Sequence, residues 1–551
     1  MKLILINNPE EYAAREMISA HIPKIKIEIC DFIPDSEDYI VSEIIKNNDS
    51  YSYNSKLQYK SCVYTYSYVS NTYSKTYVKK SINNVLTQAL GTILPWGLIT
   101  GIRPSKMARE LMEDGLTTDE IKEKFMSFYE CSQDKTELAI KVAKKEMDLI
   151  RTLPSESISL YIGIPFCPTR CLYCSFTSQS IKFSNTLTKP YMDALEKEIK
   201  YVSSLIRAKG YKIDTIYIGG GTPSIIPRKL ICELIDSIYE MYDVAEDAEI
   251  TLEANPATLN ASALKKLWKS GINRLSIGLQ SANDDELKEL GRIHNFEQFR
   301  NSFNLAREAG FDNISVDLMY GVPTQTPDSL RRTLETVVGL APEHISLYGL
   351  KIEPNTPFGQ DPNLILPDED TWCDMYLDSI DYLESQGYYQ YEISNFARDG
   401  RESRHNLRYW NCEEYLGIGP GAHSYLNNTR FSFVRDTMLY IDAMEDLTKP
   451  AQIIDEKYEI TPDERIGEYV MLRLRLVEGI DTVEFKERFG IDFESLYGQY
   501  LDSYIQGGFM IDTGRGYALT PVGMCVSNEI LSTMLSFDSN IVSGMADGRE
   551  C

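Results

Sequence analysis

The chain has 551 residues, of which 43% are hydrophobic, and a formal net charge of -25. It is too long for a single core, so we expect several domains, and its acidic balance disfavours nucleic acid as a partner because phosphate binding needs a concentrated basic face. No run approaches the roughly 18 apolar residues of a membrane span, which predicts a soluble, cytoplasmic protein.

Residues 1–155 are expected to form a separate α+β domain. The run LILI near the start and the stretch 60–79, in which tyrosine and valine alternate with polar residues, are typical of strands. The turn is expected at Ser70-Asn71-Thr72, with Tyr73 and Tyr77 in the strand that follows it. Helical spacing of apolar residues then predicts helices after Ser81, Pro104, Thr118 and Ser132, with Thr117 as a helix cap.

Residues 156–387 show a different rhythm, in which short apolar strands alternate with helical patterns. Six strands are predicted, each followed by a helix: SLYIGI, TIYIG, EITLE, RLSIG, NISVDL and HISLYGL. This alternation is typical of parallel βαβ units in a wound sheet or a partial barrel. Ligands of such folds gather at the C-terminal ends of the strands.

The remainder of the chain divides into three segments. Residues 388–460 are expected to extend the substrate side of the parallel sheet, and residues 461–535 read as helices with a small hairpin. In the first of these, GIGPGAHS (417–424) is interpreted as a loop with no clear strand before it. Residues 536–551 are polar and are interpreted as a frayed tail.

Three closely spaced cysteines, Cys167, Cys171 and Cys174, directly follow the first predicted strand. They supply three thiolates where a cubane iron–sulfur cluster has four ligand positions, which would leave one iron open. A structural zinc site is the alternative, but its candidate fourth ligands, Cys412 and His405, lie far downstream without knuckle spacing. The motif therefore favours a reactive iron–sulfur cluster.

Polar and glycine residues follow the other predicted strands. The second strand runs into GGGTPS (219–224), the third ends at Glu253, the fourth at Gln280 and the fifth at Asp317. Glycines let the backbone approach a ligand closely, and a carboxylate or amide is costly to bury without a partner. Together these residues indicate a polar ligand at one edge of the sheet.

The order of these motifs resembles a known family. CPTRCLYC after a first strand, GGGTPS, the strand-end Glu253, LSIGLQS, LGRIH and VDLMYGVP are similar to the radical S-adenosylmethionine (SAM) proteins of the oxygen-independent coproporphyrinogen III oxidase/dehydrogenase family. LPWGLITGIRPSK (94–106) resembles a longer subgroup with an extra N-terminal domain. The resemblance implies an α/β fold, a partial (β/α)6 TIM-like barrel, with a small, mostly helical, winged-helix-like C-terminal domain.

The resemblance also implies cofactors and site residues. The cofactors would be a 4Fe-4S cluster on Cys167, Cys171 and Cys174, and SAM on the open iron. Tyr161 and Arg292 would be catalytic. The SAM-binding residues would be Tyr173, Gly220, Gly221, Thr222, Glu253, Gln280, Arg292 and Asp317. Among these, Glu253 would accept hydrogen bonds from the ribose hydroxyls, and Tyr161 and Tyr173 would sit beside the cluster.

The family reaction implied is oxidative decarboxylation of coproporphyrinogen III to protoporphyrinogen IX by a 5'-deoxyadenosyl radical. The electron donor would be a reduced flavodoxin or ferredoxin. An acidic protein needs local cations to hold a tetracarboxylic tetrapyrrole. We expect them at Arg404, His405 and Arg408, and a solvated basic loop is the alternative.

Two departures leave other functions open. The best-characterised dehydrogenases carry a further cysteine after the cluster motif, where this chain has Phe176. In addition, HNLRYW (405–410) resembles the heme-binding signature of a related heme-chaperone branch. Three functions are therefore considered: coproporphyrinogen III decarboxylation, heme binding and delivery to partners, and a radical reaction that modifies or degrades heme.

Overall fold

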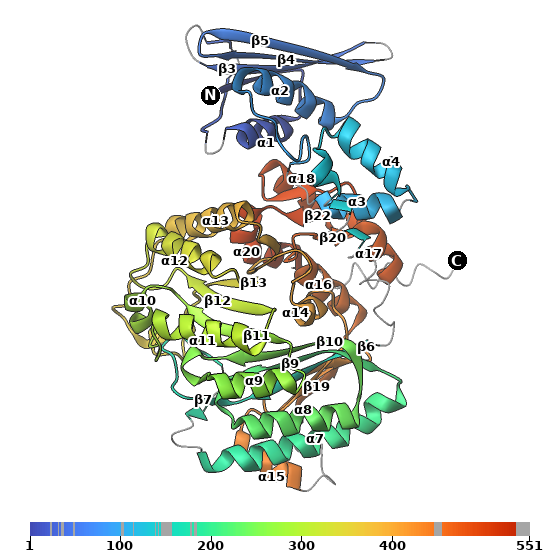
Figure 1. Ribbon diagram of the computed structural model, residues 1–551. Helices are drawn as coiled ribbons and strands as arrows, with labels where there is room; N and C mark the ends of the chain where they lie inside the picture. The colour runs from blue at the N-terminus through green and yellow to red at the C-terminus, as the bar shows by residue number, and fades with distance from the viewer. Residues whose placement is uncertain are drawn as a thin grey trace, which may run out of the picture. The chain divides into compact units, whose positions relative to one another are not determined.

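The structure is a computed structural model whose chain divides into two compact units, Met1–Leu153 and Pro154–Cys551 (Figure 1). It describes residues 1–535 except 23–24, 31, 35–37, 48–49, 101–103, 114, 138, 141–142, 145–156, 177–178, 181–184 and 446–453. The tail at 536–551 and residues 101–103 of LPWGLITGIRPSK lie outside the described residues. No helix in the described part of the chain has the length and hydropathy of a membrane span.

The N-terminal unit is a five-stranded sheet of order β2-β1-β3-β4-β5, with α1 and α2 packed against it. Strands β1 and β3 pair in parallel, whereas β3, β4 and β5 form an antiparallel meander. The expected helix cap is confirmed, since Thr117 and Glu120 form a reciprocal capping box at the start of α4. The elements are β1 (Lys2–Ile6), α1 (Glu11–His21), β2 (Glu28–Ile29), β3 (Tyr39–Lys46), β4 (Tyr51–Tyr59), β5 (Cys62–Ser70), α2 (Lys75–Leu90), α3 (Pro104–Glu113), α4 (Thr118–Glu123) and the π-helical turn η1 (Lys124–Phe128).

The predicted turn in this unit is wrong by ten residues. The hairpin between β4 and β5 turns at Lys60-Ser61, which take positive φ angles of 49° and 67°. Ser74 then caps α2 by accepting a hydrogen bond from the Thr76 backbone N–H (3.2 Å). Tyr73 and Tyr77 therefore belong to a helix start, where a spacing of four residues also keeps two side chains on one face.

The six predicted parallel strands of the second unit are confirmed. They pair in the order β13-β12-β11-β10-β9-β6 within a twelve-stranded sheet, and Figure 1 shows α7, α8, α9 and α11 on the outer side of this sheet. The strands are β6 (Ser157–Ile164), β9 (Lys212–Gly220), β10 (Asp243–Ala254), β11 (Arg274–Gln280), β12 (Ile314–Tyr320) and β13 (His344–Gly349). The main helices are α7 (Thr188–Ala208), α8 (Arg228–Met241), α9 (Ala261–Lys269), α10 (Asp284–Glu289), α11 (Phe296–Ala309), α12 (Pro327–Gly339) and α13 (Glu369–Ser385).

The two faces of this sheet differ in chemistry. In β6, Leu160, Ile162 and Ile164 are fully buried in the main hydrophobic core, and the alternate residues Ser159 and Tyr161 lie on the opposite face. The same alternation places polar side chains of neighbouring strands on that opposite face, which we call the lumen face. Short elements connect the strands: β7 (Phe166–Cys167), β8 (Gln179–Ser180), η2 (Asn185–Leu187), η3 (Pro223–Ile225), η4 (Pro256–Thr258) and η5 (Phe358–Gln360).

The sheet continues beyond the six predicted strands. The GIGPGAHS segment is preceded by a strand, contrary to expectation: β16 pairs in parallel with β6, and β17, β18 and β19 follow as an antiparallel extension. The strand was missed because Tyr415–Ile418 is a short run that already contains one of the glycines. The elements of this part are β14 (Tyr389–Glu392), β15 (Asn395–Ala397), α14 (Arg404–Trp410), β16 (Tyr415–Ile418), β17 (His423–Leu426), β18 (Thr429–Phe433), α15 (Thr437–Glu445) and β19 (Ile454–Glu459).

The C-terminal region is mostly helical, as expected, and contains a small antiparallel sheet of order β20-β22-β21. Its helices share the main hydrophobic core through residues such as Tyr469 and Phe485. The winged-helix-like expectation is met by a helix pair followed by the β21–β22 hairpin. The elements are α16 (Pro462–Arg473), β20 (Ile480–Asp481), α17 (Thr482–Phe489), α18 (Phe493–Gln506), β21 (Met510–Asp512), β22 (Gly516–Leu519), α19 (Pro521–Cys525) and α20 (Ser527–Leu535).

A buried carboxyl group fixes the loop after β16. Glu198 of α7 is 1% exposed, and its Oε2 accepts hydrogen bonds from the Gly419 N–H (3.0 Å) and the Tyr440 hydroxyl. Gly419 has φ +102°, and a Cβ there would stand 2.8 Å from the Tyr191 hydroxyl, so only glycine fits. Burial raises the pKa of Glu198 to about 8.

This carboxyl group should make stability depend on pH. Its folded pKa of about 8 exceeds the ordinary value of 4.5, so the folded state holds a proton that the unfolded state loses. The free energy of unfolding should therefore fall as pH rises from 4.5 to 8. Glu198→Gln should flatten this fall, measured by denaturant unfolding at several pH values. Lys200→Gln, an exposed substitution on α7, is the control, and equal slopes in wild type and Glu198→Gln would contradict the assignment.

Candidate functional site

The cysteine loop is tied to the ends of two other strands. Cys167, Cys171 and Cys174 take part in no disulfide, and each is partly exposed. Thr222 Oγ1, after β9, donates to Cys167 Sγ at 3.5 Å, and Arg292 Nη1, after β11, donates to Cys171 Sγ at 3.5 Å. Residues from three predicted strand ends therefore meet around the cysteines, as the parallel topology requires.

The donor set fits an iron–sulfur cubane better than a single ion. Within the described residues, no three His, Cys, Asp or Glu side chains converge as a group that could hold one metal ion. A mononuclear zinc site needs such convergence, whereas a cubane binds each thiolate through a different iron. Three thiols on one loop match the three ligand positions that a cubane with one open iron has to fill.

A glycine turn lies directly against the strand end that leads into the cysteines. Gly221 N–H donates to Ile164 O, and Thr222 N–H donates to Phe166 O, each at 2.7 Å. A Cβ on Gly221 would stand 2.6 Å from Phe166 O, and Gly220 has φ +106°. The backbone approach that the sequence predicted here therefore depends on glycine.

Glu253 is held beside this turn by two donors. Tyr217 OH donates to Oε1 at 2.8 Å and Gly220 N–H donates to Oε2 at 3.1 Å. Burial raises the pKa of Glu253 to about 7, and the nearby Asp317 charge acts in the same direction. Because the side chain is still partly exposed, its carboxylate is recessed from bulk water yet accessible to a ligand.

Tyr217 is a site residue that the sequence analysis missed. Its ring stacks on Tyr161, with centroids 6.2 Å apart and planes 18° apart, and its hydroxyl orients Glu253. It could have been found as the one polar side chain between Ile216 and Ile218 in an otherwise apolar run, since alternation in a strand places it on the lumen face.

Of the other predicted SAM-binding residues, Gln280 ends β11 and Arg292 follows α10, whereas Asp317 lies in the middle of β12, which continues to Tyr320 and does not end at Asp317 as expected. Gln280 has φ +77°, and Arg292 Nη2 donates to Gly278 O at 2.5 Å. Arg292 Nε is buried without a hydrogen-bond partner among the described residues. Asp317 accepts from Ser276 Oγ at 2.8 Å, and Tyr173 packs in a small apolar cluster beneath the cysteine loop. Their individual roles toward SAM stay predictions.

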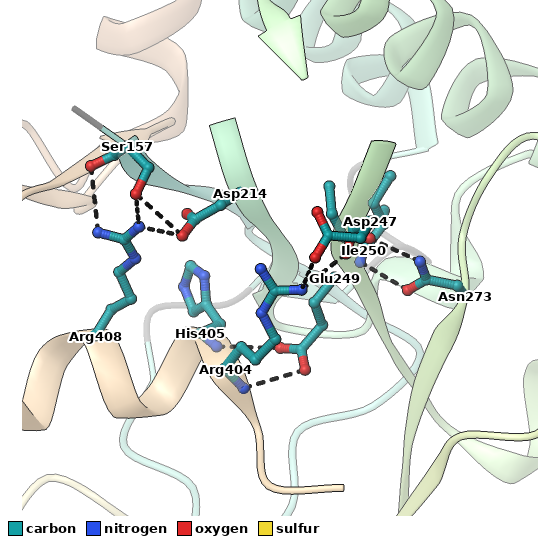
Figure 2. Close-up of polar contacts among 10 residues, drawn as sticks. Ser157, Asp214, Asp247, Glu249, Ile250, Asn273, Arg404, His405 and Arg408 are labelled. Atoms are coloured by element: carbon teal, nitrogen blue, oxygen red, sulfur yellow. Dashed lines mark hydrogen bonds and ion pairs between the residues drawn. The ribbon is translucent and has the colours of Figure 1, made fainter. Parts of the chain in front are cut away.

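Figure 2 shows the three residues expected to dock substrate on one helix, beside the strands that carry Ser157, Asp214 and Glu249. They belong to α14 (Arg404–Trp410), which contacts the beginnings of β6 and β9 through Ser157 and Asp214, and the middle of β10 through Glu249. The cysteine loop and the glycine turn follow the C-terminal ends of β6 and β9. The arginine contacts of α14 are therefore at the N-terminal ends of β6 and β9, whereas the His405 ring reaches Tyr217, whose hydroxyl bonds to Glu253.

Each of these three side chains is already engaged by the protein. Arg408 pairs with the buried Asp214 and with Glu413 (2.6 Å), and Arg404 Nη1 lies 3.3 Å from Asp247 Oδ2. Both arginines that were expected to bind a ligand are therefore already paired with carboxylates of the chain itself. The docking role of Arg404 and Arg408 stays a prediction, and in the structure they attach α14 to the N-terminal ends of the strands.

His405 is also closed to an outside ligand in this structure. It is 1% exposed, its Nδ1 lies 2.8 Å from Thr215 Oγ1, and its Nε2 lies 2.9 Å from Tyr409 OH. Its ring stacks on Tyr217 at 5.1 Å, and burial lowers its pKa to about 3. The neutral imidazole therefore uses both nitrogens inside the barrel.

Comparisons with known proteins agree with this arrangement. The radical SAM superfamily model matches residues 161–337 and the HemN C-terminal domain model matches residues 460–526. The heme chaperone HemW of Bacillus subtilis is 37% identical over 381 residues, covering 68% of this chain and 99% of that protein. The chain belongs to the HemN/HemW-like family of radical SAM proteins.

Two further proteins are similar to this chain in sequence or in fold. The heme chaperone HemW of Haemophilus influenzae is 35% identical, covering 69% of this chain and 98% of that protein. The solved coproporphyrinogen III oxidase HemN of Escherichia coli has a TM-score of 0.61 at 24% identity, covering 71% of this chain and 93% of that one, and shows the shared fold. A 4Fe-4S cluster and SAM are the cofactors of this family, and the cysteine loop and glycine turn fit them.

One expectation is overturned by these comparisons. Coproporphyrinogen III decarboxylation was expected as the reaction, but the curated relatives at 33 to 37% identity over 98 to 99% of their length are named heme chaperone HemW. The expectation was wrong because the cluster and SAM motifs on which it depended are common to radical SAM proteins and specify no reaction.

The α14 contacts make a testable distinction between two arginines. Arg408→Met should lower the free energy of unfolding by about 3–5 kcal/mol, because it leaves Asp214, 2% exposed, without its counter-charge. Arg404→Met on the same helix is the matched control and should cost at most about 1 kcal/mol, because its partner Asp247 is 68% exposed. Equilibrium denaturation measures both, and equal small losses would contradict the structural role of Arg408.

Proposed function

We propose that this protein binds heme and passes it to other proteins, and that its radical SAM site serves this task. Support comes from the 37% identity to a HemW protein over 99% of that protein's length. The observation on this chain that favours the proposal is Phe176, whose side chain is 68% exposed where the dehydrogenases carry a further cysteine.

The cofactor residues have separable tasks. Cys167, Cys171 and Cys174 would hold the cluster, with Thr222 and Arg292 donating to two of the sulfurs. The cluster with SAM supplies one-electron chemistry when both are bound. Hydrogen bonds from neutral hydroxyls and guanidinium groups to cluster sulfurs tune its potential, so these two donors are part of the site and not of the fold alone.

The chain's own groups would receive SAM at the glycine turn. Gly220 and Gly221 keep the backbone free of Cβ atoms next to the cysteine strand. Glu253, oriented by Tyr217, offers the carboxylate that would accept hydrogen bonds from the ribose hydroxyls. Arg292 has a buried Nε that has no partner in the described part of the protein and would suit a carboxylate.

The proposed function predicts binding without turnover. Anaerobically reconstituted protein should bind ferric heme and release it to a heme-free acceptor such as apomyoglobin, followed by absorption spectroscopy. Incubation with SAM, a reductant and coproporphyrinogen III should leave the tetrapyrrole mass unchanged. Failure to bind heme would reject the proposal. Recovery of a chemically altered heme, detected by mass spectrometry, would show that the protein modifies heme and does not only deliver it.

The Glu253 assignment predicts how SAM binding depends on pH. Since the pKa of Glu253 is raised to about 7, protonation below that pH removes an acceptor and should weaken SAM binding, measured by calorimetry. Glu253→Gln should weaken binding roughly ten- to hundredfold, as expected for a lost hydrogen bond to a charged group, and should abolish the pH dependence. Glu249→Gln, on the same strand but bonded to α14, is the control. An unchanged pH profile in Glu253→Gln would contradict the assignment.

A further inference from the structure

The five histidines of this chain differ sharply in accessibility. His21, His294, His344 and His405 are at most 8% exposed, and their rings contact polar atoms inside the protein. His423, the first residue of β17, is exposed. Because an imidazole must present a ring nitrogen to a metal from outside, His423 is the histidine placed to meet an iron brought by a ligand.

The sheet register puts His423 on the same face as the cofactor site. Tyr415 of β16 pairs with Ser159 of β6 and with Tyr425 of β17. Directly paired residues share a face, and side chains two positions apart share a face within a strand. His423 is two residues from Tyr425, so it lies on the lumen face with Tyr161. Ser424, between them in sequence, is fully buried and bonds to the Gly417 N–H at 2.9 Å.

His423 is also level with the cofactor site along the strands. Gly417 pairs with Tyr161, and a Cβ on Gly417 would stand 2.2 Å from His423 O, so these two backbones are adjacent. Strands are about 4.8 Å apart, which puts the His423 backbone roughly 10 Å from that of Tyr161. The site is therefore level with the paired residues Tyr161 and Tyr217, and His405 of α14 stacks on the ring of Tyr217.

The groups around His423 carry charges of both signs, and the exposed Arg435 is the cation among them that is placed to meet a carboxylate. Arg435, which is exposed, and Arg430 are the cations that act on the His423 ring, and Glu456 and Asp455 are the opposing anions. Arg430 is held at 3.0 Å by Glu468, whereas Arg435 stands next to Gly421 at the start of the β17 loop. Tyr458, paired with Arg430 and 45% exposed, adds an aromatic ring on the same face.

We propose that His423 is the axial ligand of heme iron in this protein and that Arg435 pairs with a heme propionate. This inference rests on the proposed heme-binding function and names its site. Coordination replaces a water on the iron with an imidazole nitrogen and transfers no electron. The HNLRYW histidine, His405, instead has both ring nitrogens engaged inside the chain, by Thr215 and Tyr409.

Titration of ferric heme into the reconstituted full-length protein tests this site. His423→Ala should bind heme at least roughly tenfold more weakly and lose the Soret and EPR signature of histidine ligation, and added imidazole should restore that signature. Circular dichroism and iron content should match wild type. Unchanged affinity and spectrum in His423→Ala, with wild type binding heme, would overturn the site and leave the proposed function standing. Wild type that binds no heme would overturn both.

The propionate contact has its own matched control. Arg435→Gln should weaken binding of heme but not of heme dimethyl ester, which lacks the carboxylates. The control is Lys457→Gln, which removes the same charge from β19. Lys457 pairs with Phe431, and because the adjacent residues Arg430 and Ser432 are on the lumen face, Phe431 and Lys457 are on the opposite face. This substitution should leave both affinities unchanged. If the two substitutions lowered the affinity for heme equally, the effect of Arg435 would be one of net charge alone, and its pairing with a propionate would be overturned.

Discussion

Two backbone hydrogen bonds hold the cofactor site together, those from Gly221 and Thr222 to the carbonyls of Ile164 and Phe166. They draw the turn after β9 onto the segment that leads from β6 into the cysteines. A side chain at residue 221 would collide with Phe166 O, so the close approach and the glycines require one another. The cysteine loop, the glycine turn and Glu253 consequently share one edge of the sheet.

The polar side chains of the lumen face connect that edge with the opposite one. Tyr217 donates to Glu253 with its hydroxyl and stacks its ring on His405 of α14. Most polar groups buried in a protein have a hydrogen-bond partner. Asp317 with Ser276, and His405 with Thr215 and Tyr409, follow this rule. The lumen is therefore largely hydrogen-bonded, and Ser159 Oγ and Arg292 Nε are among the buried polar atoms there that have no hydrogen-bond partner in the described part of the chain.

Much of this arrangement could be predicted from the sequence, because it follows from local periodicity. Long apolar runs such as RLSIG identify a buried strand, and parallel topology brings the residues after each strand to one edge. Two elements could not be obtained in this way. The hairpin at Lys60-Ser61 was hidden by tyrosines whose spacing fits either a strand or a helix start. Strand β16 is too short to show a period, and its pairing with β6 joins residues about 250 positions apart.

The position of α14 shows the limit of reading a motif without its fold. HNLRYW combines a histidine, aromatic rings and an arginine, and this combination suits a heme site as well as it suits a helix packed into the protein interior. The choice is made by partners that are remote in sequence: Asp214 for Arg408, 194 residues away, and Thr215 for His405, 190 residues away. A buried carboxylate at the start of β9 needs a counter-charge, and Arg408 provides it only if α14 lies at that end. The same helix then brings His405 against the ring of Tyr217, with both of its ring nitrogens bonded inside the chain. Exposure and register, which the motif does not encode, leave His423 as the histidine on the side where a tetrapyrrole and SAM could meet.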